Sequence, residues 1–301
     1  MDMLKLSVTP LVHLERISRD SGNEVYAKLE NLNPTGSHKD RESLAMITDM
    51  KNHGFKECVI ASTGNAAISL SAMAACEGIK VNVFVSKDIS PERLNLITLF
   101  EPKLHLVDGT YDDAMLESEN YAKQNKLYSA NPGHNKNKML GDSNAGKEIV
   151  SQLKPNLPDF LIVPSNNGTL ISGIWMGAKM SSANPAMIAA VAEKSALMGS
   201  IAGYHRFEAK EFDTTLSESH GRTINITDAE TSKATRDLRM EGIFCEPTSA
   251  ASLAALRILG TEGRIVVLLI TGSAFKFAKS YRMALGIKDS SSADLEHDKR
   301  P

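Results

Sequence analysis

Cysteines, aromatic residues and long apolar runs are all scarce in this sequence. Its three cysteines, Cys58, Cys76 and Cys245, lie far apart and form no C-x-x-C pair. This pattern fits neither a disulfide framework nor a zinc site, so we expect a reducing, cytoplasmic environment. The longest aliphatic run, residues 265–270, is far shorter than the ~20 residues that a membrane-spanning helix requires. Residues 1–5 lack the basic and apolar regions of a secretory signal, so we expect no cleaved leader.

An excess of charge of one sign is also lacking. The 34 lysines and arginines nearly balance 36 aspartates and glutamates, which gives a formal net charge of -2. Without excess positive charge, we expect neither nucleic acid nor an anionic membrane as the main partner. The eight histidines are scattered and form no H-E-x-x-H motif, so the sequence indicates no metal site. With 301 residues, 42% of them hydrophobic, the chain can bury the core of one large domain or two modest ones.

What the sequence does contain is an alternation of short apolar runs with longer stretches of helical period, which predicts an α/β fold with parallel strands joined by crossover helices. Several runs are apolar on both faces, as buried parallel strands are. The predicted strands cover residues 58–61, 80–86, 103–107, 160–163, 187–192 and 264–270. The predicted helices cover residues 39–52, 66–77, 91–99, 112–125, 146–153, 170–180, 228–240 and 247–259.

The first polar segment of interest, residues 33–41, places a turn directly before a helix that begins at Lys39. One interpretation is a solvated charge cluster of Lys39, Asp40 and Arg41. The other is an amine nucleophile, because a lysine at a helix N-terminus near other cations should be protonated less readily and could form a Schiff base. His38, directly beside Lys39, is the one histidine in a suggestive place.

Three further polar segments follow predicted strands. Residues 62–67 form either an ordinary N-cap or an anion site of backbone N–H groups and hydroxyls. Residues 163–170 hold a Gly/Asn turn that can cradle a phosphate, with a tight turn around a left-handed Asn as the alternative. The turn is not G-x-G-x-x-G, so a dinucleotide fingerprint is unsupported. Residues 271–273 place hydroxyls at the carboxyl end of the last strand, the edge where open α/β sheets bind ligands.

Residues 141–148 have the spacing of a Walker A motif. Glu148 stands where a P-loop needs the Ser or Thr that holds magnesium, and no strong strand precedes the segment. The sequence therefore disfavours a nucleotide-binding loop.

Together and in order, these segments resemble those of the fold type II pyridoxal-phosphate (PLP) enzymes, the tryptophan-synthase-β-like family, and within it most closely the threonine synthases. The resemblance covers the chain from about residue 9 to residue 285, and each segment falls at the strand-to-helix junction expected for it. The matching segments are residues 9–11, 28–30 with 33–41, 62–67, 167–169 with 173–175, 242–251 and 271–272.

The resemblance implies a cofactor role for each matching residue. Lys39 would form the internal aldimine with PLP and shuttle the proton at the substrate Cα. Asn65 would hydrogen-bond the ring hydroxyl, and Thr271 would face the pyridine nitrogen, which favours elimination and replacement chemistry. This chain has His38 where threonine synthases usually have an aromatic residue, and Asn166 where they have a glycine. The cofactor phosphate would be bound by Asn166, Asn167, Gly168 and Thr169.

The resemblance also implies a small amino-acid substrate, whose carboxylate Ser62 and Thr63 would bind. In threonine synthases an N-P-x-R segment followed by E-G-x-K-T helps to hold the substrate phosphate. Asn131 matches the start of this motif, but the spacing that follows is longer and contains no arginine. A lysine does not reproduce a bidentate guanidinium. The cationic groups that could replace the arginine are His134, Lys136 and Lys138.

The family fold predicts two α/β domains with the cofactor between them. We expect a smaller mobile domain at residues 36–144 and a larger one from residues 1–35 and 145–288. Closure on the substrate would keep water from reactive intermediates. We also expect a homodimer and, because residues 289–301 are polar and lack aromatics, a disordered tail.

The leading functional hypothesis is a PLP-dependent lyase of threonine biosynthesis that converts O-phosphohomoserine and water into threonine and phosphate. A second keeps PLP but changes the reaction to β-elimination or β-replacement, as in threonine or serine dehydratase and cysteine or cysteate synthase. A third is a regulatory protein that binds the cofactor without turnover, which the presence of both Lys39 and Asn65 disfavours. A nucleotide-binding protein is the fourth, and Glu148 counts against it.

Overall fold

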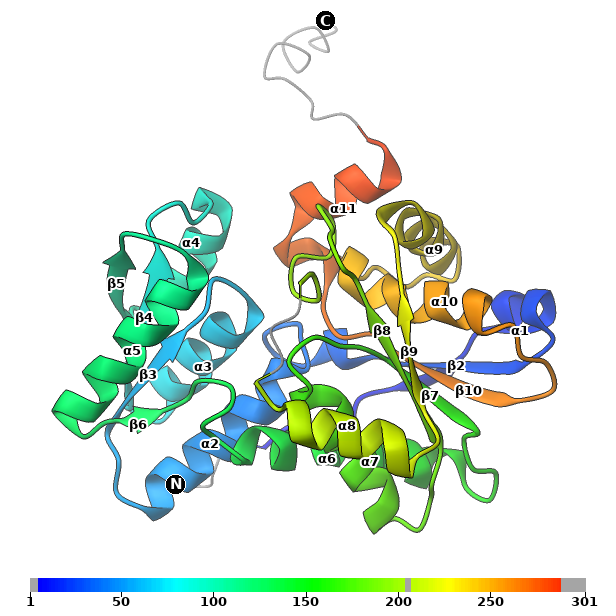
Figure 1. Ribbon diagram of the computed structural model, residues 1–301, viewed down its shortest axis with the longest axis horizontal. Coiled ribbons are helices and arrows are strands. Elements are labelled where there is room, and N and C mark those ends of the chain that lie inside the picture. Colours follow the sequence, from blue (N-terminus) through cyan, green and yellow to red (C-terminus); the bar gives the residue numbers. More distant parts are fainter. Residues whose placement is uncertain (1–4, 204–206, 288–301) are drawn as a thin grey trace, which may run out of the picture.

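The computed structural model describes residues 5–203 and 207–287, in which strands and helices alternate along the chain (Figure 1). The predicted tail at 289–301 lies outside the described residues. The strands are β1 (Leu11–His13), β2 (Glu24–Lys28), β3 (Glu57–Ala61), β4 (Lys80–Ser86), β5 (Lys103–Val107), β6 (Tyr128–Ser129), β7 (Phe160–Pro164), β8 (Ala186–Val191), β9 (Arg222–Asn225) and β10 (Ile265–Leu269). The helices are α1 (Glu15–Ser21), α2 (Lys39–Asn52), α3 (Asn65–Cys76), α4 (Pro91–Thr98), α5 (Tyr111–Asn125), α6 (Asn137–Leu153), α7 (Thr169–Met180), α8 (Ala209–Glu218), α9 (Asp228–Met240), α10 (Pro247–Leu259) and α11 (Ala278–Leu285), with 3-10 turns η1 (Glu30–Leu32) and η2 (Ala274–Lys276).

The strands form two separate sheets. The smaller sheet has the order β5-β4-β3-β6, and all of its strands are parallel. The larger sheet has the order β1-β2-β10-β7-β8-β9, and only the edge strand β1 is antiparallel to its neighbour. Figure 1 shows the smaller sheet with α3, α4 and α5 at the left and the larger sheet with α7 to α10 at the right. The predicted α/β fold with parallel sheets is confirmed.

The central strands are apolar on both faces because helices cover both. In β10, Val266 and Leu268 pack with helices α1, α9 and α10, whereas Val267 and Leu269 pack with α6, α7 and α8 on the opposite face. In the smaller sheet, helices α2, α3 and α4 cover one face and α5 covers the other. Burying both faces removes a large apolar area from water, which is the main stabilising contribution to such a fold.

The longest predicted elements agree with the structure, and the differences concern short or glycine-containing ones. Helices α2, α9 and α10 have the predicted bounds, and the six predicted strands are β3, β4, β5, β7, β8 and β10. Strands β1, β2, β6 and β9 and helices α1, α8 and α11 were not predicted, and β1 and β6 have only three and two residues. Every strand of the smaller sheet lies between residues 57 and 129, and every strand of the larger sheet lies outside residues 36–144. The mobility of residues 36–144 as a domain stays a prediction.

The segment with Walker A spacing is part of a helix rather than a loop. Its two glycines let α6 approach its neighbours closely, because a Cβ at Gly141 would overlap the carbonyl oxygen of Arg41 in α2 and one at Gly146 would overlap that of Ile174 in α7. Gly177 of α7 is similarly pressed against the backbone of α6. Close helix packing explains this glycine spacing, and the rejection of a nucleotide-binding loop is supported.

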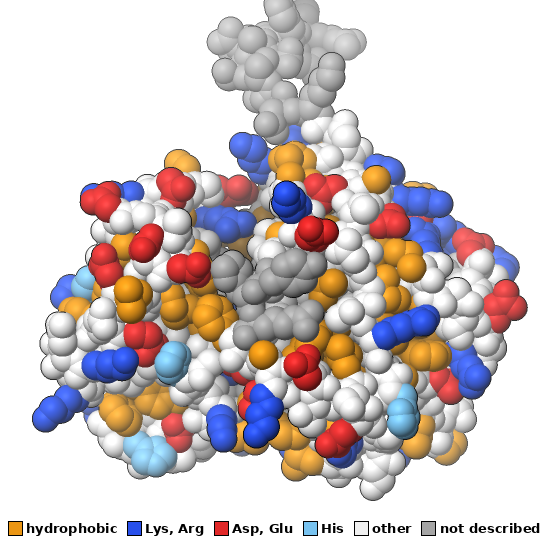
Figure 2. All heavy atoms as spheres, viewed as in Figure 1, with side chains coloured by type: hydrophobic (Ala, Val, Ile, Leu, Met, Phe, Trp, Pro, Cys, Tyr) orange, Lys and Arg blue, Asp and Glu red, His pale blue; other side chains and the backbone are white. Residues whose placement is uncertain are grey.

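The surface carries charges of both signs. Figure 2 shows lysine and arginine side chains interspersed with aspartate and glutamate over the face in view. Across residues 5–203 and 207–287, no helix is both long enough and apolar enough to cross a membrane.

Candidate active site

A cavity of about 440 Å³ opens where strands of both sheets end. Its walls include the loop after β3, the loop after β7 and the residues around the end of β10 and the start of α10. Parallel strands direct their carboxyl ends to one edge of a sheet, and ligands of open α/β sheets bind at that edge. The cavity is therefore the candidate active site.

Lys39 lines this cavity at the first position of α2. The preceding turn is held in place by Asp40, whose carboxylate accepts hydrogen bonds from Thr35 N at 2.7 Å and Thr35 Oγ1 at 2.5 Å. The backbone N–H of His38 donates to the carbonyl oxygen of Thr271 at 3.0 Å, which attaches the turn to the end of β10. These contacts bring the Lys39 amine and the Thr271 hydroxyl to the same cavity.

The charge state of Lys39 differs from the prediction. Burial lowers the pKa of the Lys39 amine, but the nearby carboxyl groups of Glu42, Asp142 and Glu208 outweigh burial and raise that pKa above its ordinary value. The Lys39 amine donates directly to Glu42 Oε1, and the Glu42 side chain is only 1% exposed. The expectation that Lys39 is protonated less readily is therefore wrong for the protein alone, because a carboxylate lies closer to it than the neighbouring cations do.

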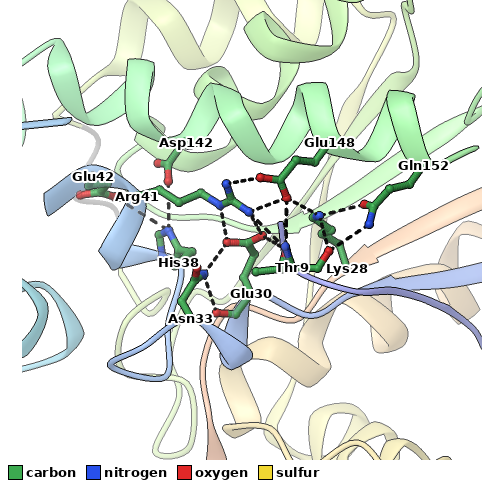
Figure 3. Close-up of polar contacts among 10 residues, drawn as sticks. All are labelled: Thr9, Lys28, Glu30, Asn33, His38, Arg41, Glu42, Asp142, Glu148 and Gln152. Atoms are coloured by element: carbon green, nitrogen blue, oxygen red, sulfur yellow. Dashed lines mark hydrogen bonds and ion pairs between the residues drawn. The ribbon is translucent and has the colours of Figure 1, made fainter. Parts of the chain in front are cut away.

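A buried ionic network fixes the other side of α2 (Figure 3). Arg41 donates from Nε and Nη2 to the two oxygens of Glu30 at 2.7 and 2.8 Å, and from Nη1 to Glu148 Oε1 at 2.7 Å. Lys28 of β2 donates to Glu148 Oε2 at 2.6 Å. Burial and these hydrogen bonds act in opposite directions, and the net effect lowers the pKa of both Glu30 and Glu148. The network joins β2, α2 and α6 behind the cavity, and Glu148 has a structural role in it.

The loop after β3 offers the first anion site. Helix α3 begins after Gly64, which supplies no side-chain cap, and the loop residues Ser62, Thr63 and Asn65 line the cavity. Ser62 Oγ accepts a hydrogen bond from Gly64 N at 3.2 Å. The first N–H groups of a helix have no acceptor within the helix, so this end can hold a carboxylate. Between the two interpretations of this segment, the structure favours the anion site over an ordinary N-cap.

The loop after β7 offers the second anion site, at the start of α7. Gly168 has φ +95°, and a Cβ there would lie 2.9 Å from the carbonyl oxygen of Glu208 and 3.0 Å from Phe212 Cβ. Gly168, and not Asn166 or Asn167, takes the left-handed conformation, so the alternative of a turn around a left-handed Asn is wrong. The turn lines the cavity and Gly168 itself supplies no side-chain cap, although Asn167 Oδ1 accepts from Thr169 N at 3.4 Å. Backbone N–H groups at such a helix start can bind a phosphate.

Asn65, Glu246 and Thr271 also line the cavity. Asn65 Nδ2 donates to Glu246 Oε2 at 3.3 Å, while Asn65 Oδ1 is buried and has no hydrogen-bond partner within residues 5–203 and 207–287. Thr271 Oγ1 lies 2.9 Å from Ser249 Oγ. Burial raises the pKa of Glu246 above its ordinary value. A buried amide oxygen without a partner requires a ligand that donates to it, and the ring hydroxyl of PLP is such a group.

These features fit PLP. Lys39 would hold it covalently, the turn at Gly168 would bind its phosphate, and Asn65 would bind its ring hydroxyl. When bound, PLP supplies an electron sink that stabilises negative charge at the substrate Cα.

The structure brings together most of the residues selected from the sequence and leaves three outside the cavity wall. Those that line the cavity are Lys39, Ser62, Thr63, Asn65, Asn166, Asn167, Gly168 and Thr271. Thr169 is buried behind the turn, where its hydroxyl donates to Glu208 Oε2 at 2.9 Å. Asn131 is buried too, and its Oδ1 accepts from Ala61 N at 2.8 Å, which fixes the end of β3. His134 is exposed and does not line the cavity.

Of the lysines considered for the substrate phosphate, Lys136 is exposed and away from the cavity, whereas Lys138 lines it. Among the charged cavity residues, Arg93 and Glu246 were not assigned a role from the sequence. Arg93 stands in the first turn of α4, where a cation opposes the helix dipole, and this unfavourable position was the available signal. Glu246 precedes the first residue of α10, and only the folded structure shows that it faces Asn65.

The comparisons with known proteins indicate the same cofactor. A sequence profile described as "Pyridoxal-phosphate dependent enzyme" matches residues 3–272. Threonine synthases from Bacillus sp. (strain ULM1) and Methanosarcina acetivorans are each 30% identical to the chain over 89% of its length, and the alignments cover 83% and 75% of those proteins.

Solved structures show the same fold. An O-ureido-L-serine synthase superposes with a TM-score of 0.81 at 19% identity and covers 96% of both chains. A cysteine synthase from Entamoeba histolytica gives 0.80 at 22% identity, covering 96% of this chain and 91% of its own. Threonine deaminase isoform 2 from Solanum lycopersicum gives 0.80 at 17% identity, covering 93% and 84%. The fold type II architecture is confirmed, and with the match to nearly the whole sequence the chain belongs to the family of pyridoxal-phosphate dependent enzymes.

Proposed function

We propose that the protein is a PLP-dependent lyase of the threonine synthase type, which converts O-phosphohomoserine and water into threonine and phosphate. Its similarity to threonine synthases, at 30% identity over 89% of the chain, supports this reaction. In this reaction phosphate leaves from Cγ and water adds at Cβ. The cavity must then hold three anionic groups: the cofactor phosphate, the substrate carboxylate and the substrate phosphate.

Arg93 is the observation that carries the proposal. It lines the cavity beside the loop after β3, where its Nη1 donates to Thr63 Oγ1 at 3.3 Å and its Cζ lies 5.3 Å from the centre of the Phe277 ring. No carboxylate among residues 5–203 and 207–287 forms an ion pair with this guanidinium. A cation without a counter-ion in a ligand cavity favours an anionic ligand group, and a guanidinium can bind phosphate through two parallel hydrogen bonds.

Other cavity residues would bind the substrate and transfer its proton. Ser62, Thr63 and the N–H groups that open α3 would hold the substrate carboxylate, because they line the cavity next to Arg93. Lys39 Nζ would carry the proton to and from the substrate Cα, since Lys39 lines the cavity and its side chain is 19% exposed. Phe277 and Pro132 would exclude water from the mouth of the cavity.

The test is phosphate release from O-phosphohomoserine, compared among wild type, Arg93→Met, Lys138→Met and Lys136→Met. A charge-assisted contact to phosphate contributes about 1.5–3 kcal/mol, so Arg93→Met should lower kcat/KM for O-phosphohomoserine by about tenfold or more. Turnover of threonine should change far less. Lys136→Met is the control, because Lys136 is exposed outside the cavity.

Other outcomes assign the site differently. If wild type deaminates threonine or consumes O-phosphoserine but releases no phosphate from O-phosphohomoserine, the β-elimination or β-replacement reaction replaces the proposal. If Arg93→Met matches wild type while Lys138→Met loses kcat/KM for O-phosphohomoserine but not turnover of threonine, the reaction stands and Lys138 is the phosphate ligand.

We also propose that the protein is a homodimer and is cytoplasmic. Light scattering on the purified protein at several concentrations measures the oligomeric state, and a monomer at every concentration would refute the dimer.

A further inference from the structure

The amine of Lys39 is held by a carboxylate that has no assigned role in the reaction. Glu42 lies one helical turn after Lys39 on α2, and its Oε1 accepts from the Lys39 amine. Its other oxygen, Oε2, lies 3.0 Å from the amine of Lys138, which reaches over from α6. The side chains of Glu42 and Lys138 are only 1% and 2% exposed. One buried carboxylate therefore lies between two lysine amines, and both lysines line the cavity.

The close packing of α6 on α2 places Lys138 next to Glu42. Gly141 of α6 packs directly on the backbone of Arg41, so the two helices approach without an intervening side chain. Lys138 and Asp142 lie three residues before and one residue after Gly141, and both side chains are buried against the first turn of α2. The contact between Glu42 and Lys138 follows from this close packing.

The other titratable groups near Lys39 leave Glu42 as its main counter-ion. Burial and the adjacent Glu42 raise the pKa of Asp142 well above its ordinary value, which weakens Asp142 as a counter-ion of Lys39. His38 Nδ1 lies 3.4 Å from Asp142 Oδ1, and burial together with the charge of Lys39 lowers the pKa of His38 to about 3. Glu208 also acts on Lys39 through its charge, but its carboxylate is bound by Thr169 Oγ1 and by Gly133 N.

We propose that Glu42 is a positioning residue for Lys39, which fixes the amine at the cavity wall and keeps it protonated until a carbonyl ligand arrives. The proposal rests on the assignment of Lys39 as the lysine that binds PLP. An ammonium group has no free electron pair, so its proton must leave Nζ for water before the nitrogen can attack a carbonyl carbon. Glu42 thus sets the pH at which Lys39 accepts its cofactor. Lys138 weakens this hold, because it shares the same carboxylate.

The direct test measures the reactivity of the Lys39 amine in cofactor-free protein. Trace labelling with acetic anhydride over a range of pH, followed by peptide mass spectrometry, reports the protonation of each lysine separately. In Glu42→Gln, Lys39 should react about tenfold faster than in wild type near neutral pH, which corresponds to a pKa lower by about one unit. In Lys138→Met it should react more slowly than in wild type, because Glu42 then has Lys39 as its only ammonium partner.

Two controls separate this effect from general damage. Asp49→Asn removes a carboxylate from the same helix, but Asp49 contacts Tyr128 and His53 and does not line the cavity, so Lys39 labelling should not change. Glu42→Asp keeps the charge and should restore slow labelling at least in part. If Glu42→Gln fails to fold because two amines then share a buried site, Glu42→Gln with Lys138→Met removes the second cation and should give the same fast labelling.

The outcomes separate this proposal from that of the PLP lysine. Unchanged Lys39 labelling in Glu42→Gln and in the double variant, or faster labelling in Lys138→Met, would overturn the role of Glu42. Borohydride reduction of the PLP-loaded wild type tests the assignment of Lys39 independently. A pyridoxyl group found on a different lysine would remove the functional meaning of the Glu42 contact even if the labelling result holds.

Discussion

The turn that we assign to the cofactor phosphate depends on a glycine, and replacing that glycine tests the assignment. Gly168 has φ +95°, where a residue with a Cβ is strained by about 1–2 kcal/mol. A Cβ would also lie 2.9 Å from the carbonyl oxygen of Glu208 and 3.0 Å from Phe212 Cβ. Overpacking of this kind costs about 1–3 kcal/mol. If the loop kept its shape, Gly168→Ala would therefore lose about 2–5 kcal/mol of stability.

A loop that moves to relieve this strain also moves the N–H groups that would bind the phosphate. We expect PLP affinity to fall at least tenfold, about 1.4 kcal/mol, in Gly168→Ala, and further in Gly168→Asp because of its negative charge. Titration of cofactor-free protein with PLP, followed by absorbance, measures the affinity. Thermal unfolding of the same samples measures the stability.

Gly199→Ala is the matched control for this experiment. Gly199 also lines the cavity, but a Cβ there would meet no atom of the described residues within 4 Å and its backbone is not in the left-handed region. It should keep both affinity and stability. PLP binding to Gly168→Ala as tight as to wild type and Gly199→Ala would refute the assignment of this turn.

Three other predictions concern α2. Borohydride reduction and peptide mapping should place the cofactor on Lys39, and Lys39→Ala should still fold because Glu42 keeps Lys138 as its counter-ion. Arg41→Met leaves the Glu30 carboxylate buried and unpaired, so denaturant unfolding should show a loss of about 3–5 kcal/mol, partly restored by a second change, Glu30→Gln. Because the pKa of His38 is lowered from 6.5 to about 3 by burial, the unfolded chain binds a proton in this range that the folded chain does not. Stability should thus fall as pH decreases from 6.5 toward 3, and His38→Phe should flatten this part of the pH profile of unfolding.

Much of the fold could be predicted from the sequence because several strands and helices have a clear local sequence pattern. Strands such as β4 and β10 are mostly apolar on both faces, and this pattern predicts buried strands. Helix α10 begins with Pro247 and ends at Gly260 in the left-handed conformation, as its sequence indicates. Strands β1 and β6 have only three and two residues, and their strand character comes from pairing with β2 and β3 rather than from local pattern.

Helix α6 shows why some boundaries were not predictable. It begins at Asn137, well before the predicted start at residue 146. The added part contains Gly141, and glycine has a low helix propensity. In the structure Gly141 and Gly146 are sites of close contact with α2 and α7. Tertiary packing stabilises a helix whose local propensity is poor, and the sequence alone does not show which helices will meet.

The candidate site likewise contains residues that could be predicted from the sequence and residues that could not. Residues at the carboxyl ends of strands, such as Ser62, Gly168 and Thr271, were predictable since parallel topology brings those ends to one edge. The role of Glu42 was not predictable, because it depends on contact with Lys138. This residue lies 96 positions away in the sequence, and only the packing of α6 on α2 brings its amine to 3.0 Å from Glu42.

The first turn of α2 serves two buried ionic clusters at once, and this follows from helix geometry. Successive residues of an α-helix point about 100° apart, so Arg41 and Glu42 face different sides of the same turn. Arg41 reaches Glu30 and Glu148 and ties the helix to the larger sheet, while Glu42 is buried next to the cavity-lining Lys39 and holds its amine. A buried charge is stable only with a partner. Each of the two clusters therefore restricts the orientation of α2, and with it the position of the other cluster. The anchoring that Arg41 provides is therefore a condition for the contact between Glu42 and Lys39, and loss of Arg41 should loosen Lys39 even though the two side chains belong to separate clusters.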